Sequence, residues 1–207
     1  MRTDEIANKL EHFFVAEKGY SAVPTQIIQD NGKRKFTYTA IRGEINTQSY
    51  RNHIKTEVGL TPSPLIDHDK CYWGAIDIDT YNMEGAKKKE IIEGAKELHL
   101  APAFSKSQGI HLYCVSKDKI LAKAMRNYLA YCRATLKLDP KTEIFPKQDE
   151  VSITEENGFK KFGYGNGITI PYRSFEIHAD KDQPWGIEIY KEDKIRLLQP
   201  LEFFRLL

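Results

Sequence analysis

Hydrophobic residues recur at helical spacing in several stretches of the chain, with polar residues between them. In the stretch that follows Lys119, for example, Met125, Leu129 and Cys132 recur every three or four positions, which places them on one helix face. Capping residues and glycines bound most of these stretches. The pattern predicts helices over Thr3–Lys18, Thr47–Val58, Met83–Leu98, Lys119–Leu136 and, more briefly, Pro200–Leu207.

Between the predicted helices, β-branched and aromatic residues concentrate in short stretches that predict strands. The Asn31-Gly32 pair separates the first two of these stretches and is a strong signal for a β-hairpin. Loops are expected over Leu60–Asp69 and Gly158–Gly167. The expected strands cover Val23–Gln29, Lys35–Ile41, Lys70–Asp79, Ala101–Ser105, Ile110–Ser116, Thr142–Pro146, Ile168–Tyr172 and Trp185–Tyr190.

The order of elements from Lys70 to Pro146 is strand, helix, strand, strand, helix, strand. This order is that of the split βαβ unit of ferredoxin-like and RNA-recognition-motif (RRM-like) folds. Each right-handed crossover leaves a gap that the first strand of the other unit fills, so the Lys70–Asp79 strand should lie between Ile110–Ser116 and Thr142–Pro146. We therefore predict an α+β fold, with an RRM-like unit and an N-terminal helix–hairpin–helix unit packed beside it.

Two acids stand at the end of this central strand. Side chains alternate between the faces of a strand, so Asp77 and Asp79 share a face, with their Cα atoms about 7 Å apart. Two such carboxylates repel each other, and a divalent cation would relieve the repulsion. Taken alone, however, an Asp-x-Asp sequence is more often a pair of exposed acids.

The turn before the Ile110–Ser116 strand is rich in groups that suit a phosphate. Ser105 and Ser107 offer hydroxyls, Lys106 offers a cation, and the glycine that follows allows a tight turn with free N–H groups. His111 begins the returning strand and could donate to a triphosphate oxygen. We predict a nucleotide-binding role for these residues, although a lone histidine at a strand end is usually structural.

The other expected neighbour of the central strand supplies a third carboxylate. Glu143 lies on it, and Asp139, a few residues earlier, is the alternative. Two acids on one strand, a third from the adjacent strand and a phosphate-binding turn on the other side predict a two-metal site for nucleotidyl transfer. Catalysis there is mostly positioning and charge neutralisation.

Composition adds bounds to this picture. The 207 residues suit one domain, and the net charge of +2, from 31 basic and 29 acidic residues, does not by itself indicate nucleic-acid binding. The three cysteines are expected to be reduced, buried thiols in a cytoplasmic protein, because their number is odd and no two have metal-ligand spacing. No stretch approaches the ~20 apolar residues of a membrane span, so we expect no membrane partner.

Four segments carry a resemblance to a known family. Together they resemble the motifs of the archaeo-eukaryotic primase (AEP) superfamily, most closely the primase-polymerase domains of phages, mobile elements and conflict systems. The resemblance covers roughly Leu60 to Tyr172. The four segments in this order are a more specific signal than any one segment alone. The segments are Trp73–Asp79, Ser105–Tyr113, Glu143–Gln148 and Gly165–Tyr172.

The resemblance implies a template-directed DNA primase or DNA polymerase that adds nucleotides from a dNTP or NTP to a 3′-hydroxyl during DNA replication. It implies Mg²⁺ or Mn²⁺ as cofactor, single-stranded DNA template and primer as partners, a helicase domain or protein as a further candidate partner, and a bacterial, archaeal or phage-infected cytoplasm. Gln108 departs from the glycine that relatives often have, and since no zinc-binding stem is visible, no zinc is expected.

The resemblance also assigns roles to residues. It implies Asp77, Asp79 and Glu143 as metal ligands. It implies that Ser107 and His111 contact the incoming nucleotide. Nucleotide or template contacts are carried over less directly to Lys106, Lys147 and Asn166.

Two other functions fit the same fold. A non-catalytic module that binds single-stranded nucleic acid would place aromatic residues, not acids, on the central strands. A replication-initiator nuclease would need a histidine pair and a tyrosine nucleophile, and only His111 is present in that strand. We expect one catalytic domain with an N-terminal subunit (1–60), a motif-bearing palm (61–172) and a closing segment (173–207), and the apolar end suggests a longer parent protein.

Overall fold

The structure is a computed structural model that describes residues 3–28, 34–56, 58–79, 83–104, 109–156, 158–173, 187–191 and 194–198. It has an α+β fold built from helices and several antiparallel sheets. The described helices are α1 (Thr3–Phe13), α2 (Thr47–Lys55), α3 (Gly85–Glu97) and α4 (Ala122–Thr135). The described strands are β1 (Lys18–Ile28), β2 (Arg34–Glu44), β3 (Gly59–Pro62), β4 (Lys70–Ile78), β5 (Ala101–Phe104), β6 (Ile110–Leu121), β7 (Glu143–Phe145), β8 (Ile153–Glu156), β9 (Phe159–Phe162), β10 (Ile187–Lys191) and β11 (Lys194–Leu198).

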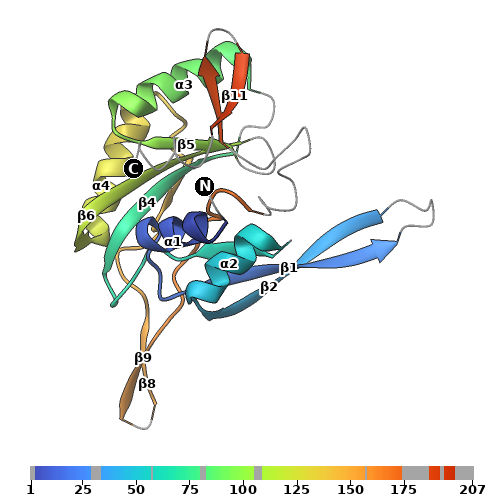
Figure 1. Cartoon of the computed structure of the whole chain (residues 1–207). Helices are drawn as coiled ribbons and strands as arrows, with labels where there is room; N and C mark the ends of the chain where they lie inside the picture. The colour runs from blue at the N-terminus through green and yellow to red at the C-terminus, as the bar shows by residue number, and fades with distance from the viewer. Residues whose placement is uncertain are drawn as a thin grey trace.

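The central sheet has four strands in the order β5-β6-β4-β7, and every neighbouring pair is antiparallel. Figure 1 shows β5, β6 and β4 of this sheet side by side. The strand that carries Asp77 is therefore an interior strand, with β6 on one side and β7 on the other. This confirms the neighbours predicted from the order of elements. The two crossovers, through α3 and α4, bring these strands together.

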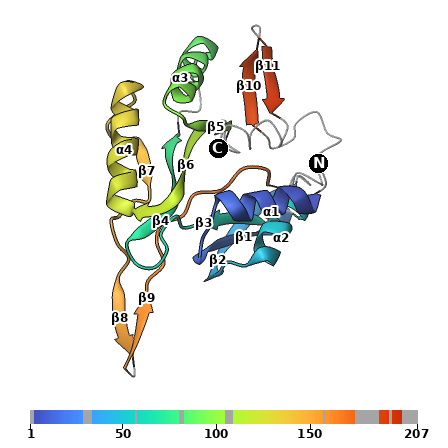
Figure 2. The ribbon, with the colours of Figure 1, turned by 60° about the vertical axis from the view of Figure 1, so that its left-hand side comes forward.

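Each face of the central sheet packs on its own hydrophobic core. Helices α3 and α4 lie on one side of the sheet, and α1 and α2 lie on the other (Figure 2). The alternation along β4 distributes its side chains between the two cores. Ile76 packs under α3 and α4 with Leu129, whereas Trp73 packs under α1 and α2 with Tyr113. Asp77 follows Trp73 on the face toward α1 and α2.

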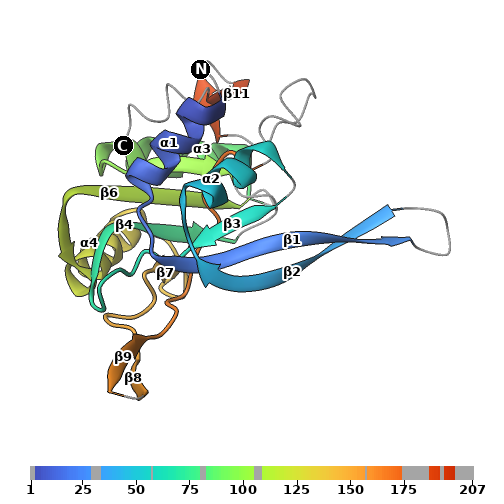
Figure 3. The ribbon, with the colours of Figure 1, turned by 60° about the horizontal axis from the view of Figure 1, so that its bottom comes forward.

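A second sheet, in the order β2-β1-β3, carries a long hairpin that extends away from the rest of the fold (Figure 3). Its two long strands exceed the lengths predicted from the local pattern. Strand β3 lies where a loop was expected over Leu60–Asp69, because Gly59–Pro62 pairs with β1 at Ala22–Gly19. Helix α2 begins at a capping box in which the Asn46 side chain and the Ser49 backbone and side chain bond reciprocally.

Each of the four described helices is shorter than its predicted range: α2 ends at Lys55 and not at Val58, and α3 spans Gly85–Glu97 and not Met83–Leu98. In α1 and α4, long-range strand pairing takes one end of the predicted range. The helix predicted over Thr3–Lys18 stops at Phe13, since Lys18 starts β1 and pairs with Glu44. The helix predicted to begin at Lys119 begins at Ala122, since β6 runs on to Leu121. Sheet pairing overrides the local helical period in both cases.

The prediction of a loop over Gly158–Gly167 is wrong in its first half, where β8 and β9 form a hairpin that projects from the body (Figure 1). Gly158 supplies the positive φ of 78° that its tip requires. The predicted strand Ile168–Tyr172 is an extended segment whose Ile168 and Ile170 amides donate to β3 carbonyls at 3.3 Å. Strand β10 covers most of Trp185–Tyr190, whereas 185–186 and Pro200–Leu207 lie outside the described residues.

The cysteines are free thiols, as expected. Cys71 and Cys132 are buried and Cys114 is half-buried. Burial raises the pKa of Cys71 to about 12 and that of Cys114 to about 11, so these thiols stay protonated and unreactive at neutral pH. Every helix of the described residues is too short or too polar to cross a lipid bilayer.

Candidate active site

Three polar residues form a row across the central sheet. The register pairs Asp77 of β4 with His111 of β6 on one side and with Glu143 of β7 on the other. Residues directly opposite each other in an antiparallel sheet share a face, so the three side chains leave the sheet on the same side. Residues that lie far apart in the chain are therefore neighbours in space.

Asp77 and His111 are in contact. The Oδ1 atom of Asp77 lies 3.2 Å from Nε2 of His111, and the two side chains are only 15% and 10% exposed. This approach is a close contact and not an aligned hydrogen bond, because Oδ1 is a buried atom with no hydrogen-bond partner among the described residues. A buried carboxylate oxygen without a hydrogen bond is costly to leave unpaired, which favours a cation at this position.

A chain of hydrogen bonds behind His111 sets the orientation of its ring. Nδ1 of His111 lies 2.9 Å from the Tyr113 hydroxyl, which donates its proton to the Thr169 carbonyl oxygen at 2.7 Å. Because that proton is committed to a carbonyl, the Tyr113 oxygen accepts from Nδ1–H, and Nε2 points at Asp77. Burial, and then the charge of Asp77, raise the pKa of Tyr113 well above its usual value, so this hydroxyl stays protonated.

Glu143, at the other end of the row, has a cation as partner. Its carboxylate accepts from Nζ of Lys147 at 2.6 Å, and the side chains are 49% and 36% exposed, respectively. The same Nζ lies 5.0 Å from the centroid of the Phe145 ring. The alternative acid, Asp139, lies in the turn before β7, where it accepts from the Lys141 amide. The register thus puts Glu143, and not Asp139, opposite Asp77.

The remaining predicted site residues are distributed around this row. Asp79 follows the end of β4 and is exposed. Asn166 is exposed and its amide donates to the Gln148 side chain at 2.9 Å, one residue from Lys147. Ser105, Lys106 and Ser107 lie outside the described residues.

Two contributors to this site were not predicted from the sequence. Tyr113 and Thr169 lie in segments that carry the family resemblance, but neither was assigned a role. The spacing of His111 and Tyr113, two positions apart on a strand, implied a shared face and could have suggested a link between them. The contact with Thr169 depends on tertiary structure and had no local signal.

The donor set fits a hard divalent cation in its chemistry. Carboxylate oxygens are the ligands that Mg²⁺ and Mn²⁺ prefer, and the unbonded Oδ1 of Asp77 offers a site for positive charge. As the side chains stand, Asp77 turns to His111 and Glu143 turns to Lys147. Accordingly, no cluster of three or more acidic, histidine or cysteine side chains is gathered for a metal in the part of the chain that the structure describes.

A cavity of about 410 Å³ opens beside Glu143, between α4 and the edge strand β7. Its lining includes Lys123, Arg126, Arg133 and Lys147. Arg126 is paired with Asp149 at 2.8 Å, and Arg133 donates to the Thr142 carbonyl oxygen at 2.8 Å. The lining also holds the acids Glu143 and Asp149, and because the cavity lies on the α4 side of the sheet, it is separate from the face that carries Asp77 and His111.

Comparison with known proteins shows the family of the chain. The family model described as "TOTE conflict system, Archaeo-Eukaryotic Primase domain" matches residues 2–182. The chain belongs to this family of primase-type nucleotidyl transferases. No curated protein matches the chain.

Proposed function

We propose that this chain is a template-dependent nucleotidyl transferase that adds nucleotides from a dNTP or NTP to the 3′-hydroxyl of a primer. The observation that carries the proposal is the row of His111, Asp77 and Glu143 on one face of the central sheet. Membership of the primase family supplies the reaction class. The row supplies the residue types that this reaction needs, namely carboxylates for metal and a nitrogen donor for phosphate.

The carboxylates of Asp77, Asp79 and Glu143 would hold Mg²⁺ or Mn²⁺. When bound, such ions lower the pKa of the attacking 3′-hydroxyl and neutralise the charge on the departing pyrophosphate. His111, oriented by Tyr113, presents Nε2 beside these carboxylates, where the imidazolium form, with both ring nitrogens protonated, can donate to a triphosphate oxygen. Most of the work of the protein groups is therefore positioning and charge compensation.

Other residues are proposed to bind the substrates. Lys147 forms an ion pair with Glu143. When a metal ion binds the Glu143 carboxylate, the Lys147 ammonium group can pair with a nucleotide phosphate instead. Asn166, held by Gln148, is a candidate contact to nucleotide or template. Ser105, Lys106 and Ser107 stay predicted phosphate contacts.

The arrangement of domains is part of the proposal. We infer an RRM-like palm within 61–172, because the strand order β5-β6-β4-β7 is that of the split βαβ unit. Residues 1–60 would form an N-terminal subunit and 173–207 a closing segment of one catalytic domain. Single-stranded DNA template and primer would be its partners in DNA replication, with a helicase as a further candidate partner.

The alternative functions have less support. A replication-initiator nuclease needs a second histidine near His111, but the residue two positions on, which shares its face, is Tyr113. A module that only binds nucleic acid would not place Asp77 and Glu143 on neighbouring strands of the same sheet face. These two carboxylates repel a phosphate backbone unless a cation lies between them.

A primer-extension assay tests the proposal. The chain would be incubated with a primed single-stranded template, labelled dNTPs and either Mg²⁺ or Mn²⁺, beside Asp77→Asn and Glu143→Gln. We expect extension by the parent, at least about 100-fold less by each variant, and none after EDTA, because metal ions contribute several kcal/mol to such reactions. Asp118→Asn, an exposed acid on β6 away from the row, is the matched control and should extend like the parent.

Extension by Asp77→Asn at the parental rate would contradict the assigned site, and absence of metal-dependent extension by the parent would contradict the reaction. Thermal unfolding of each variant shows whether a loss reflects the site or the fold. Asp77→Asn should unfold close to the parental temperature, because the amide keeps the size of the carboxyl group and Oδ1 of Asp77 has no hydrogen-bond partner among the described residues.

A further inference from the structure

The N-terminal sheet carries a second row of side chains, separate from the row on the central sheet. Tyr20 of β1 pairs directly with Arg42 of β2 and with Thr61 of β3, so the three side chains share a face. The Thr61 hydroxyl lies 3.0 Å from the Thr169 hydroxyl, on the extended segment beside β3. This row crosses the sheet from its β2 edge toward the central sheet.

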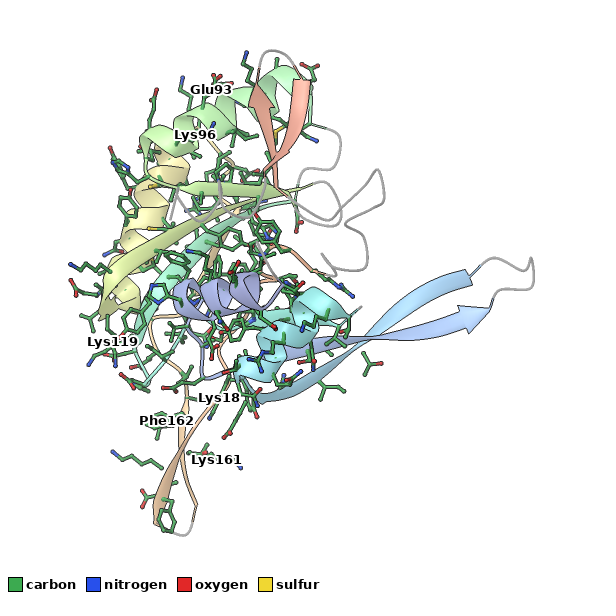
Figure 4. All side chains as sticks on the ribbon, in the orientation of Figure 1. Lys18, Glu93, Lys96, Lys119, Lys161 and Phe162 are labelled. Carbon is green, nitrogen blue, oxygen red and sulfur yellow. The ribbon has the colours of Figure 1, made fainter. Side chains whose placement is uncertain are left out.

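Cations and tyrosine rings meet at the β2 end of this row. The guanidinium carbon of Arg42 lies 5.4 Å from the ring centroid of Tyr20 and 6.0 Å from that of Tyr164. Nζ of Lys18 lies 5.4 Å from the Tyr164 centroid and donates to the Phe162 carbonyl oxygen at 2.7 Å. Figure 4 shows Lys18 and Phe162 close together where the β8–β9 hairpin leaves the body. We call Lys18, Tyr20, Arg42 and Tyr164 the arginine–tyrosine surface.

Arg42 and Tyr164 of the arginine–tyrosine surface are open to solvent, whereas Lys18 and Tyr20 are half-buried. Arg42 is exposed and the Tyr164 ring is 37% exposed. Within the described residues, no carboxylate is close enough to form an ion pair with Arg42 or Lys18. An exposed guanidinium beside aromatic rings can offer a flat surface to a nucleobase and positive charge to a phosphate.

We propose that the arginine–tyrosine surface binds single-stranded nucleic acid, as the template strand of the reaction proposed above, on which this inference rests. Sequence-tolerant binding of single strands combines aromatic stacking platforms with cations that follow the backbone. Tyr164 and Arg42 supply the stacking groups, and Lys18 and Arg42 supply the charges. A duplex, whose bases are already stacked inside, cannot use the rings.

A series of hydrogen bonds links this surface to the candidate active site. The Thr169 carbonyl, at the inner end of the row, accepts from Tyr113, which orients His111. Tyr164 is also two residues from Asn166, whose amide donates to Gln148 near Lys147. A strand that lies across Arg42 and Tyr164 is thereby led toward the face that carries Asp77.

Glu44 should oppose the binding of nucleic acid, and its substitution tests the electrostatic contribution to that binding. Glu44 pairs with Lys18 across β1 and β2 and therefore lies on the same face as Arg42. Its charge repels a phosphate backbone at this edge of the sheet. Glu44→Gln should accordingly tighten the binding of a single strand, whereas removal of Arg42 or of the Tyr164 ring should weaken it.

Fluorescence anisotropy with labelled oligo(dT) and oligo(U) tests this proposal, in EDTA and without nucleotide. We expect the parent to bind a single strand more tightly than a duplex of the same length. Tyr164→Ala should raise the Kd about tenfold, because a base loses the aromatic ring on which it stacks. Arg42→Ala should weaken binding similarly and lower the slope of log K against log salt by about 0.7.

Two control variants distinguish the loss of this binding surface from general effects of a substitution on the protein. Tyr164→Phe keeps the ring and should bind like the parent, and Tyr131→Ala removes an exposed tyrosine from α4 and should do the same. Parental affinity in both Arg42→Ala and Tyr164→Ala overturns the proposal, as does a parent that fails to bind or that prefers duplex. The two oligonucleotides show whether DNA or RNA is the better ligand.

The outcome is independent of catalysis, because the titration contains no metal or dNTP. Metal-dependent extension together with unchanged binding by Arg42→Ala would overturn the arginine–tyrosine surface alone. Absence of extension together with the expected losses of affinity would overturn the proposed reaction and leave a single-strand-binding surface.

Discussion

Asp77 and His111 face each other across two neighbouring strands, with Oδ1 of the carboxylate 3.2 Å from Nε2 of the ring. The other ring nitrogen is held by the Tyr113 hydroxyl, which is itself held by the Thr169 carbonyl. Nδ1 of His111 is therefore hydrogen-bonded within the fold, whereas Nε2 faces the candidate metal and nucleotide site. This division between an anchored and a presented nitrogen is common where a histidine must act in one orientation.

The first prediction concerns this anchor. Tyr113→Phe removes the hydroxyl and leaves the Nδ1–H of His111 and the Thr169 carbonyl without their bonds in a buried place. We expect a loss of about 2–3 kcal/mol in the free energy of unfolding, since each unsatisfied buried group costs about 1–3 kcal/mol. Because the ring is no longer oriented, the KM for the incoming nucleotide should rise at least about tenfold in steady-state extension assays.

Tyr128→Phe is the matched control for that prediction. Its hydroxyl also donates to a carbonyl oxygen, that of Leu98, at 2.7 Å, but it lies on α4 at the surface. This variant should lose less than about 1 kcal/mol and should keep the parental KM. An unchanged KM in Tyr113→Phe would mean that the hydroxyl has only a structural role.

A second prediction concerns the lysine that holds Glu143. Lys147 competes with a metal ion for that carboxylate, so Lys147→Met should strengthen the binding of Mn²⁺, measured by titration with the electron paramagnetic resonance signal of free Mn²⁺. The free energy of unfolding should change by less than about 1 kcal/mol, because the pair is substantially exposed.

Lys119→Met provides the comparison, since Lys119 pairs with Asp67 at the same 2.6 Å and at similar exposure, away from the candidate site. This variant should bind Mn²⁺ like the parent. Weaker or unaltered Mn²⁺ binding in Lys147→Met would argue against Glu143 as a metal ligand.

A third prediction concerns pH. His53 is fully buried, accepts from the Leu60 amide at 2.9 Å through Nδ1 and donates to the Pro171 carbonyl oxygen at 2.9 Å through Nε2. Burial lowers the pKa of His53 from 6.5 to about 4. The unfolded chain therefore binds a proton at a higher pH than the folded one, and this contribution to stability is complete above pH 6.5 and is lost as the pH falls toward 4.

Urea unfolding at pH 7 and pH 5 measures this effect. The free energy of unfolding should fall by about 2 kcal/mol between these values from His53 alone, at 1.36 kcal/mol per pKa unit. His53→Gln should be less stable than the parent at pH 7 and should lack the fall of about 2 kcal/mol between pH 7 and pH 5. His12→Gln, at an exposed position on α1, should retain this fall. Equal pH dependence in the parent and His53→Gln would contradict the assignment.

A fourth prediction concerns the close packing of β4. A Cβ atom at Gly74 would lie 2.6 Å from the Phe145 carbonyl oxygen and 2.7 Å from Cγ of Met125. Gly74→Ala must therefore displace β7 or α4, and we expect a cost of about 1–3 kcal/mol in urea unfolding. Gly43→Ala on β2, where nothing lies within 4 Å, should be tolerated. Equal stability of the two variants would contradict the tight packing.

The local pattern of the sequence was sufficient for the elements around the site and for their order. The alternation in Trp73–Asp79 identified the central strand, and the crossover rule placed the strands of His111 and Glu143 on either side of it. The same pattern failed at Lys18 and at Lys119–Leu121, where strand pairing with distant residues outweighs the local helical period. It also missed β3, β8 and β9, which are short strands without a marked alternation.

What the sequence alone determined is which residues share a face of an element, because the periods of strands and helices are local properties of the backbone. The tertiary structure decided which faces meet. The register of β4 against β6 and β7 sets Asp77 opposite His111 and Glu143, and a slip of one residue would turn the aspartate to the other core. The contacts of Tyr113 with Thr169 and of Arg42 with Tyr164 join residues far apart in the chain, and they depend on loop closure and on the packing of two sheets, which no local period encodes.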